Sequence, residues 1–186
     1  FPVEYSIDGT NWSLLGTTGA TPLTRTLQPG DKVYLRATAN TWYEYQEEPY
    51  IEHGCAIFGV SKVGGNIMSL LYGSNFTGNE TTFPTGSSYN FRYLFIELND
   101  EQYNRNLISA SELMLPAAIL ADSCYRNMFY GCTSLTTAPA LPATTLAESC
   151  YANMFDSCTS LVSAPALPAT TLAQNCYNNM FWGCTS

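Results

Sequence analysis

The chain carries the stretch LPATTLAESCYANMFDSCTSL from Leu141, with a close copy on each side: LPAAILADSCYRNMFYGCTSL from Leu115 and LPATTLAQNCYNNMFWGCTS from Leu167. Equivalent residues of the three copies stand 26 positions apart, and both register and residue identity are kept. The cysteines mark this register in two sets: Cys124, Cys150 and Cys176, then Cys132, Cys158 and Cys184. A period of about 20–50 residues is typical of proteins built from stacked repeats.

One copy of the repeat predicts a short strand, a turn and a short helix. Residues 135–138 favour a strand, which Pro139 limits because proline has no N–H to donate. Thr144 or Thr145 can cap the start of a helix, and Glu148 stands at capping-box distance from Thr145. An apolar residue then recurs at every fourth position, as on the buried stripe of a helix over residues 145–155. Leu146, Cys150 and Met154 lie in this helix, and Cys158 continues the spacing after Asp156-Ser157 ends it.

The apolar face of a single repeat cannot be buried by that repeat alone, so neighbouring copies must cover it. We therefore predict an α/β solenoid of 26-residue repeats, each a short strand plus a short helix. Equivalent side chains should form columns through the core: leucine over leucine, phenylalanine over phenylalanine and cysteine over cysteine.

The consensus of the copies, LPATTLAxxCYxNMFxxCTSL, resembles the BspA-like leucine-rich repeats of bacterial cell-surface and secreted proteins, such as those of the Bacteroides group. Three further strings resemble the β-rich segment that precedes such repeats: EYSIDGTNWS (4–13), LQPGDKVYLRATA (27–39) and GGNIMSLL (64–71). The resemblance implies a leucine-rich repeat fold and a role in adhesion or host-protein binding. It transfers no binding residues, because the repeat motif defines a fold and not a site.

Residues 1–64 predict a small β-sandwich-like unit that caps the first repeat. Short segments there alternate apolar and polar residues, and Asp8-Gly9 is a hairpin signal between two of them. The unit is short for an independent sandwich, so we expect it to dock on the repeats. Its strands are predicted at residues 3–7, 12–15, 32–39 and 55–60.

Residues 65–186 predict the solenoid, with degenerate first rungs and regular repeats from about residue 115. Degenerate terminal copies are expected in repeat proteins. Residues 66–71 are the first such rung. Two later segments align with the regular copies, with insertions within 99–106 and around 112–114. The alignments are 90–95 with 124–129 and 107–110 with 135–138.

Charge and hydropathy exclude some classes of partner. The net charge is −8 over 186 residues, and Lys and Arg are absent after Arg126, which argues against nucleic acid and anionic membranes. No apolar run approaches ~20 residues, so no membrane span is predicted. The chain opens at Phe1 rather than Met, so we expect a trimmed, mature protein without its signal or lipid anchor. We expect it outside the cell or on the outer cell surface.

The titratable residues predict no catalytic residue, metal site or cofactor. Six of the seven cysteines occupy fixed apolar positions, which favours buried, reduced thiols, and their spacing matches no zinc motif. His53 is the single histidine and lacks a nucleophile partner in its context. An acidic loop is interpreted as a solvated face, with calcium as an alternative that lacks the usual spacing. It holds Glu44, Glu47, Glu48 and Glu52.

We predict a non-enzymatic protein that binds an extracellular protein or glycan through the strand side of the repeats. Alternate residues should face outward on an extended, uncharged surface: Thr137, Pro139, Ser163 and Pro165. Leu135, Ala138, Leu161 and Ala164 should face the core. Positions that vary between the copies should face solvent, so Tyr130 and Trp182 are candidate stacking residues, with Asp156 at the equivalent position.

Two other functions compete with this hypothesis. The N-terminal unit could be a carbohydrate-binding module that uses Trp42, Tyr43, Tyr45 and Tyr50. A glycan-active enzyme needs two facing carboxylates, and the regular repeats offer Glu148 and Asp156 at positions that are not repeated. After Ser186 no polar cap follows, and we expect a monomer rather than an end-to-end dimer because Pro165 blunts the last strand.

Overall fold

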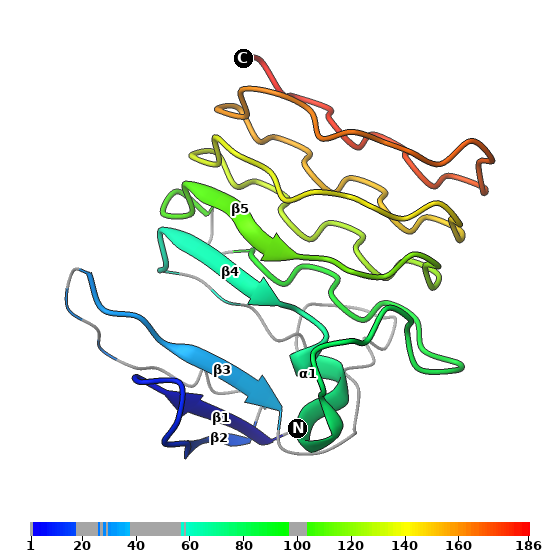
Figure 1. Ribbon diagram of the computed structural model, residues 1–186. Coiled ribbons are helices and arrows are strands. Elements are labelled where there is room, and N and C mark those ends of the chain that lie inside the picture. The colour runs from blue at the N-terminus through cyan, green and yellow to red at the C-terminus, as the bar shows by residue number, and fades with distance from the viewer. Residues whose placement is uncertain are drawn as a thin grey trace.

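The computed structural model describes residues 2–17, 26, 28, 30–37, 57, 59–96 and 104–186. A small sheet lies at the N-terminal end, and the chain then runs back and forth in layers that stack up to the C-terminus (Figure 1). We call these layers rungs. They are rung 1 (62–96), rung 2 (107–132), rung 3 (135–158) and rung 4 (161–184).

The N-terminal sheet has three antiparallel strands in the order β2-β1-β3, and these strands confirm three of the predicted ones. They are β1 Pro2–Ser6, β2 Ser13–Thr17 and β3 Tyr34–Ala37. Glu4 lies opposite Arg36, which donates from Nε to the Glu4 carboxylate at 2.8 Å and stacks on Trp12. The strand predicted over 55–60 is wrong at Ile57, Gly59 and Val60, and its other residues lie outside the described part.

The strand side of the stack begins with β4, Lys62–Asn66, and β5, Ser109–Met114, which pair in parallel. Parallel pairing follows because each rung repeats the same path. A side chain at Gly64 would meet the Glu112 side chain at 2.9 Å, so this close approach requires glycine. After β4 the chain forms α1, Ser69–Tyr72, and a 3-10 turn, Gly73–Asn75.

Bridges continue the ladder beyond β5 and fix the register between rungs. Ser109 pairs with Thr137, 28 residues on, whereas Ile119 pairs with Thr145, 26 residues on. Rung 2 therefore holds two extra residues between these bridges, where the sequence predicts an insertion. They lie in or next to β5, which is longer than the equivalent part of rung 3, where Thr137 forms a single bridge.

The helix predicted over 145–155 is wrong: these residues form consecutive turns. Every second N–H bonds three residues back, as when Met154 donates to the Tyr151 carbonyl at 3.1 Å. The N–H groups between them donate to the next rung, as when Phe155 donates to the Met180 carbonyl at 2.9 Å. Half of the amides in this segment therefore run along the stack instead of along a helix. We call this side the turn wall: residues 89–95, 121–131, 147–157 and 173–183.

Left-handed residues at every fourth position explain why no helix forms. In rung 3 they are Ser149 (φ 52°), Asn153 (φ 53°) and Ser157 (φ 62°). A left-handed residue ends a right-handed helix after each turn, and Asn, Ser and Gly accept that conformation better than bulky residues do. The same positions in rungs 2 and 4 are also left-handed: Ser123, Asn127 and Gly131, then Asn175, Asn179 and Gly183.

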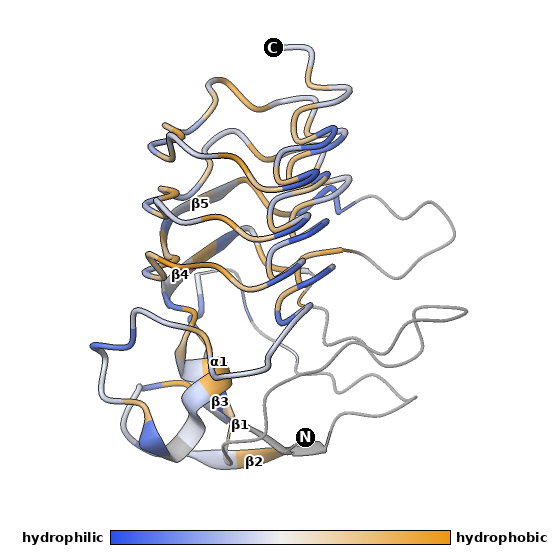
Figure 2. Cartoon of the chain, turned by 90° about the vertical axis from the view of Figure 1, so that its right-hand side faces the viewer, coloured by the Kyte–Doolittle hydropathy of each residue, from blue (hydrophilic) through white to orange (hydrophobic). Residues whose placement is uncertain are grey.

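Stacked aromatic rings fill the core between the strand side and the turn wall, which lie opposite each other in Figure 2. Phe95, Phe129, Phe155 and Phe181 stack with centroids 5.0, 5.3 and 5.6 Å apart. A second column runs through Phe91, Tyr125, Tyr151 and Tyr177 at 5.7–5.8 Å. The columns confirm the alignment of 90–95 with 124–129. Burying each interior ring contributes about 1.5–3 kcal/mol.

Candidate binding surface

The strand side of rungs 2 to 4 presents neighbouring columns of hydroxyl and apolar side chains. Thr137 and Ser163 are exposed there, which confirms that both face outward. Ser109 and Thr136 are half-buried beside them. We call this surface the strand face; its residues are Ile108, Ser109, Ser111, Thr136, Thr137, Val162 and Ser163.

Hydrogen bonds tie the hydroxyls of the strand face together. Thr137 Oγ1 donates to Ser109 Oγ at 2.6 Å, and the Ser109 and Ser111 hydroxyls lie 3.1 Å apart. Thr136 Oγ1 donates to the Ile108 carbonyl at 3.0 Å. Each hydroxyl oxygen has two lone pairs, so acceptor sites remain open to solvent after these bonds form. The network fixes the hydroxyls in a row that a ligand with N–H or O–H donors can meet.

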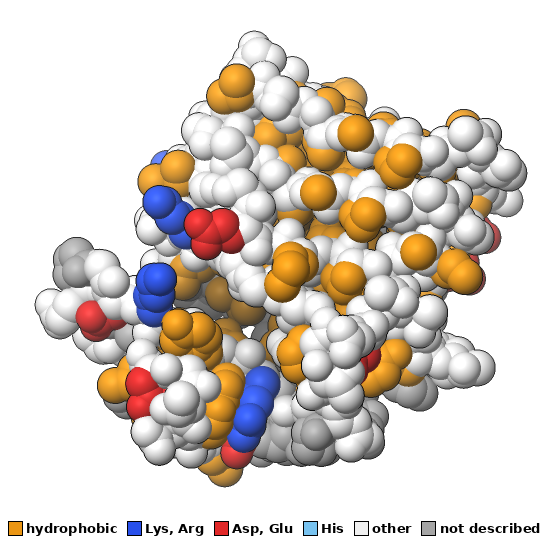
Figure 3. All heavy atoms as spheres, in the orientation of Figure 1, with side chains coloured by type: hydrophobic (Ala, Val, Ile, Leu, Met, Phe, Trp, Pro, Cys, Tyr) orange, Lys and Arg blue, Asp and Glu red, His pale blue; other side chains and the backbone are white. Residues whose placement is uncertain are grey.

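Apolar side chains flank the hydroxyls. Ile108 is 46% exposed and Val162 is 70% exposed. These two residues form one column with Thr136, which lies between them in rung 3. None of the residues that define the strand face is charged, and the upper part of this side is white and orange in Figure 3. Such a surface suits apolar and hydrogen-bonding contacts rather than charge-driven capture.

Two prolines that were predicted to face outward on this surface are not fully exposed. Pro139 is buried and Pro165 is half-buried, so the prediction that Pro139 faces outward is wrong. Ala164, predicted in the core, is exposed, whereas Ala138 is half-buried. In both equivalent pairs, Pro139 with Pro165 and Ala138 with Ala164, the residue of rung 3 is less exposed than that of rung 4. The reason is that rung 4 covers rung 3, whereas no described residue covers rung 4.

The variable positions of the turn wall do not form one aromatic patch. Trp182 is 66% exposed, Tyr130 is half-buried, and Asp156 between them in the column is buried. The prediction that all three face solvent is therefore wrong at Asp156, whose carboxylate accepts a bond from the Ser157 hydroxyl at 2.7 Å. Tyr130 and Trp182 also belong to the turn wall and not to the strand face.

A further exposed line, missed by sequence reasoning, runs through the second set of bridges. Ile119 bridges both Thr82 and Thr145 and is 56% exposed, and Thr145 is exposed as well. The sequence predicts Thr144 or Thr145 as a helix cap, whereas Thr145 forms a bridge. The β-branched residues Ile119 and Thr145 at equivalent positions are the available signal for that bridge.

The thiols of the stack are placed for packing. Five of the six in the described residues are buried, Cys184 is half-buried, and all six are free. Burial raises the pKa of Cys150 to about 11, and it raises that of Cys124 as well. In the second column each thiol lies close to a carbonyl of the preceding rung, as Cys158 Sγ does to Phe129 O at 3.2 Å. Such thiols remain protonated and poorly nucleophilic.

The part of the chain that the structure describes contains no group of three or more side chains suited to a metal ion. His53, the acidic loop (Glu44, Glu47, Glu48 and Glu52) and the aromatic platform (Trp42, Tyr43, Tyr45 and Tyr50) lie outside that part. Among the described helices, none is long and apolar enough to cross a membrane.

Comparison of the chain with models of protein families, with curated proteins and with solved structures gave no match.

Proposed function

We propose that the protein is a non-enzymatic repeat protein that binds an extracellular protein or glycan through the strand face. The repeat string and its resemblance to BspA-like leucine-rich repeats support a place in that family and a location outside the cell. We also propose that residues 1–64 form a domain that caps the repeats.

The observation that carries this proposal is the hydroxyl row from Ser111 through Ser109 to Thr137, with Ser163 in the next rung. The hydroxyls of Ser111, Ser109 and Thr137 are held by one another, so a ligand would meet a surface that needs little ordering there before it binds. The flanking Ile108 and Val162 add apolar area that water leaves on contact. Successive rungs repeat the pattern, which suits several weak contacts with an extended ligand.

The experiment is a binding screen of the chain against immobilised glycans and purified extracellular proteins. Wild type should retain at least one ligand, and the double variant Thr137→Lys, Ser163→Lys should lose it, because two long charged side chains would cover the hydroxyl row. The control is Asn178→Lys, which places one such lysine on an exposed position of the turn wall. It should bind as wild type does.

Two results would contradict the proposal: no ligand in either screen, or a ligand whose binding the strand-face variant leaves unchanged. Loss of binding in Asn178→Lys with retention in the double variant would assign the site to the turn wall instead.

A further inference from the structure

Two arginines lie at equivalent positions of the turn wall in neighbouring rungs. Arg92 of rung 1 matches Arg126 of rung 2, because the core rings on either side of them stack at 5.8 and 5.0 Å. Paired strands, and therefore neighbouring rungs, lie roughly 4.8 Å apart. Both arginines are half-buried, and the equivalent positions of rungs 3 and 4 hold the uncharged Ala152 and Asn178. We call Arg92 and Arg126 the arginine pair.

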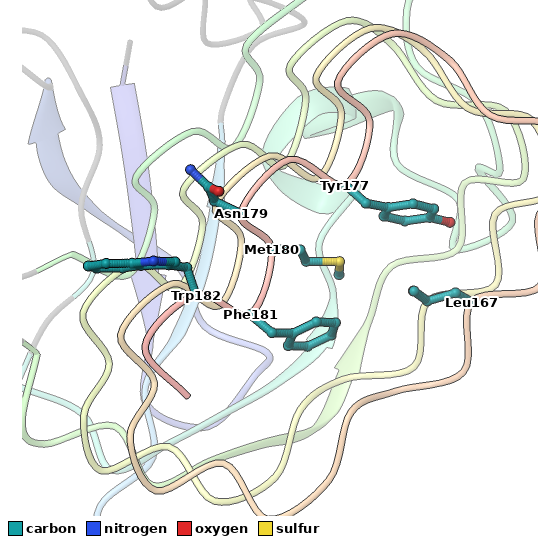
Figure 4. Close-up of a pocket in the computed structure, with 6 residues that line it drawn as sticks. All are labelled: Leu167, Tyr177, Asn179, Met180, Phe181 and Trp182. Carbon is teal, nitrogen blue, oxygen red and sulfur yellow. The ribbon is translucent and has the colours of Figure 1, made fainter. Parts of the chain in front are cut away.

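An aromatic ring stands beside this pair on the outer surface of the turn wall. In rung 4, Trp182 points away from the core rings Tyr177 and Phe181 (Figure 4). Tyr130 is the equivalent of Trp182 in rung 2, so it belongs to the same outward column, and it is half-buried. It follows Arg126 by four residues, which is the repeat of the turns in this wall. The pair and the Tyr130 ring are therefore neighbours along the wall.

Polar atoms of rung 2 lack partners at this place. Arg126 Nε and Asn127 Oδ1 are buried and form no hydrogen bond. None of the residues that the structure describes makes an ion pair or a hydrogen bond with the Arg126 guanidinium. A half-buried charge in this situation has lost hydration without gaining a bond, which is unfavourable. Arg92 differs, because it stacks over Tyr89 at 5.7 Å and over Tyr93 at 5.0 Å.

We propose that the arginine pair binds the carboxylate of an acidic saccharide. A guanidinium holds the two oxygens of a carboxylate by paired hydrogen bonds, and the pair offers one guanidinium from each of two rungs. A saccharide also brings hydroxyl donors beside its carboxylate, and Asn127 Oδ1 is an acceptor that lacks one. The apolar face of a sugar ring packs on aromatic rings such as that of Tyr130. This site is separate from the strand face.

Acidic residues of the turn wall limit the ligand to few negative charges. Asp122 and Glu148 are exposed there, and Asp122 accepts the backbone N–H of Glu148 at 3.1 Å. Asp156 accepts the Ser157 hydroxyl at 2.7 Å, so neither aspartate serves as the partner of Arg126. Because like charges repel, a nucleic acid or a densely sulfated chain would be disfavoured, whereas one carboxylate would not.

The test uses a disaccharide that contains one glucuronic acid residue, and its methyl ester is the neutral control with the same two rings. Nuclear magnetic resonance of the isotope-labelled protein reports the side-chain Nε–H group of each arginine. We expect the acid to shift the Arg126 Nε–H signal and the ester to leave it in place. Raising the salt concentration from about 0.1 M to 1 M should weaken the binding, because it screens the charges.

Variants of the full chain test the residues themselves. Arg126→Gln should weaken the binding of the acid about tenfold or more, since a hydrogen bond to a charged group is lost. Arg126→Lys keeps the charge without the paired bonds and should weaken it less. The matched control Lys62→Gln removes the same charge from an exposed position of β4 and should bind as wild type does.

The strand-face variant Thr137→Lys, Ser163→Lys separates this proposal from the proposed function. A ligand lost in Arg126→Gln belongs to the arginine pair, and a ligand lost in the double variant belongs to the strand face. The two proposals therefore succeed or fail independently.

Three results would overturn the proposal: no binding of the acid, equal binding of acid and ester, or wild-type binding by Arg126→Gln. If Arg126→Gln does not fold, the comparison of acid with ester and the Arg126→Lys variant decide the question. A short peptide with one aspartate is tested in the same way. Tighter binding of that peptide, with the same dependence on Arg126, would overturn the assignment to a saccharide.

Discussion

Rungs 3 and 4 have almost the same sequence and very different surroundings. Residues 141–160 and 167–186 differ at five of twenty positions, yet Leu141 is 3% exposed and Leu167 is 38% exposed. Phe155 is fully buried and Phe181 is half-buried. Because the side chains are the same, the neighbouring rung and not the residue determines the burial. The stability of such a stack is then a sum of rung terms and interface terms.

The largest expected contrast comes from truncating one ring in each rung. Phe155→Ala should cost about 3–5 kcal/mol of unfolding free energy, because it opens a cavity between two rings at 5.3 and 5.6 Å. Phe181→Ala should cost about half as much or less, since one face of that ring is uncovered. Urea unfolding followed by circular dichroism measures both values. Equal losses would mean that rung 4 is covered in solution.

Alkaline pH should sharpen the same contrast. Burial raises the pKa of Cys150 to about 11 from an ordinary value of 9.0. A group whose pKa is raised by folding adds stability that is complete below the unfolded pKa and is lost as pH rises through the folded pKa. Between pH 9 and 10.5 the wild type should therefore lose about 1 kcal/mol more than Cys150→Ala does.

The control for this pH series is Cys184→Ala in the half-buried position of rung 4. Burial raises the pKa of Cys184 too, but its thiol has a path to solvent. Its removal should change the slope of stability against pH less than removal of Cys150 does. Identical slopes in both variants and wild type would contradict the burial of the inner thiol.

A smaller change in unfolding free energy should distinguish turns from a helix in rung 3. Asn153 is left-handed, so Asn153→Ala should destabilise the protein by about 1 kcal/mol. In a helix the same change would be stabilising by several tenths of a kcal/mol, because alanine is the better helix former. The control Asn178→Ala lies at an exposed turn-wall position without a positive φ and should be near neutral. If Asn153→Ala stabilises the protein instead, this result would support a helix at residues 145–155 and contradict the turns.

The sequence predicted the register of the rungs better than their local structure. Identity at 26-residue spacing is enough to place Phe129 over Phe155, and Asp8 with Gly9 marks the connection of β1 to β2. The helix prediction failed because a period of four, as in Cys150 and Met154, is close to the 3.6-residue period of a helix. Ser, Asn and Gly at every fourth position held the correct signal, since these residues accept positive φ.

The candidate surface was partly predictable for a related reason. Outward positions of a strand follow from alternation, so Thr137 and Ser163 were placed correctly. Pro139 and Asp156 were misplaced because their burial depends on the rung above, which one repeat does not reveal. The predicted alignment of 107–110 with 135–138 is confirmed and places Ser109 beside Thr137, although the hydroxyl bond between them is not visible in the sequence.

Another prediction concerns the rates at which two equivalent thiols react, which involves the smallest free-energy difference. Cys158 and Cys184 occupy equivalent positions, and each thiol lies 3.2 Å from a carbonyl of the preceding rung. Burial raises the pKa of both, so at pH 8 neither holds much thiolate. Access then decides the rate: half-buried Cys184 should react through small local openings, whereas fully buried Cys158 should wait for rung 3 to open. Iodoacetamide labelling of the native protein, read by peptide mass spectrometry in a Cys55→Ser background, should modify Cys184 first by a wide margin. Labelling of Cys158 as fast as Cys184 would mean that the two rungs open together.

The number of free thiols is a further prediction about the same side chains. The wild-type chain unfolded without reductant should titrate close to seven thiols, because six of its cysteines occupy repeat positions whose thiols are free in the described residues. A count of one would require three disulfides.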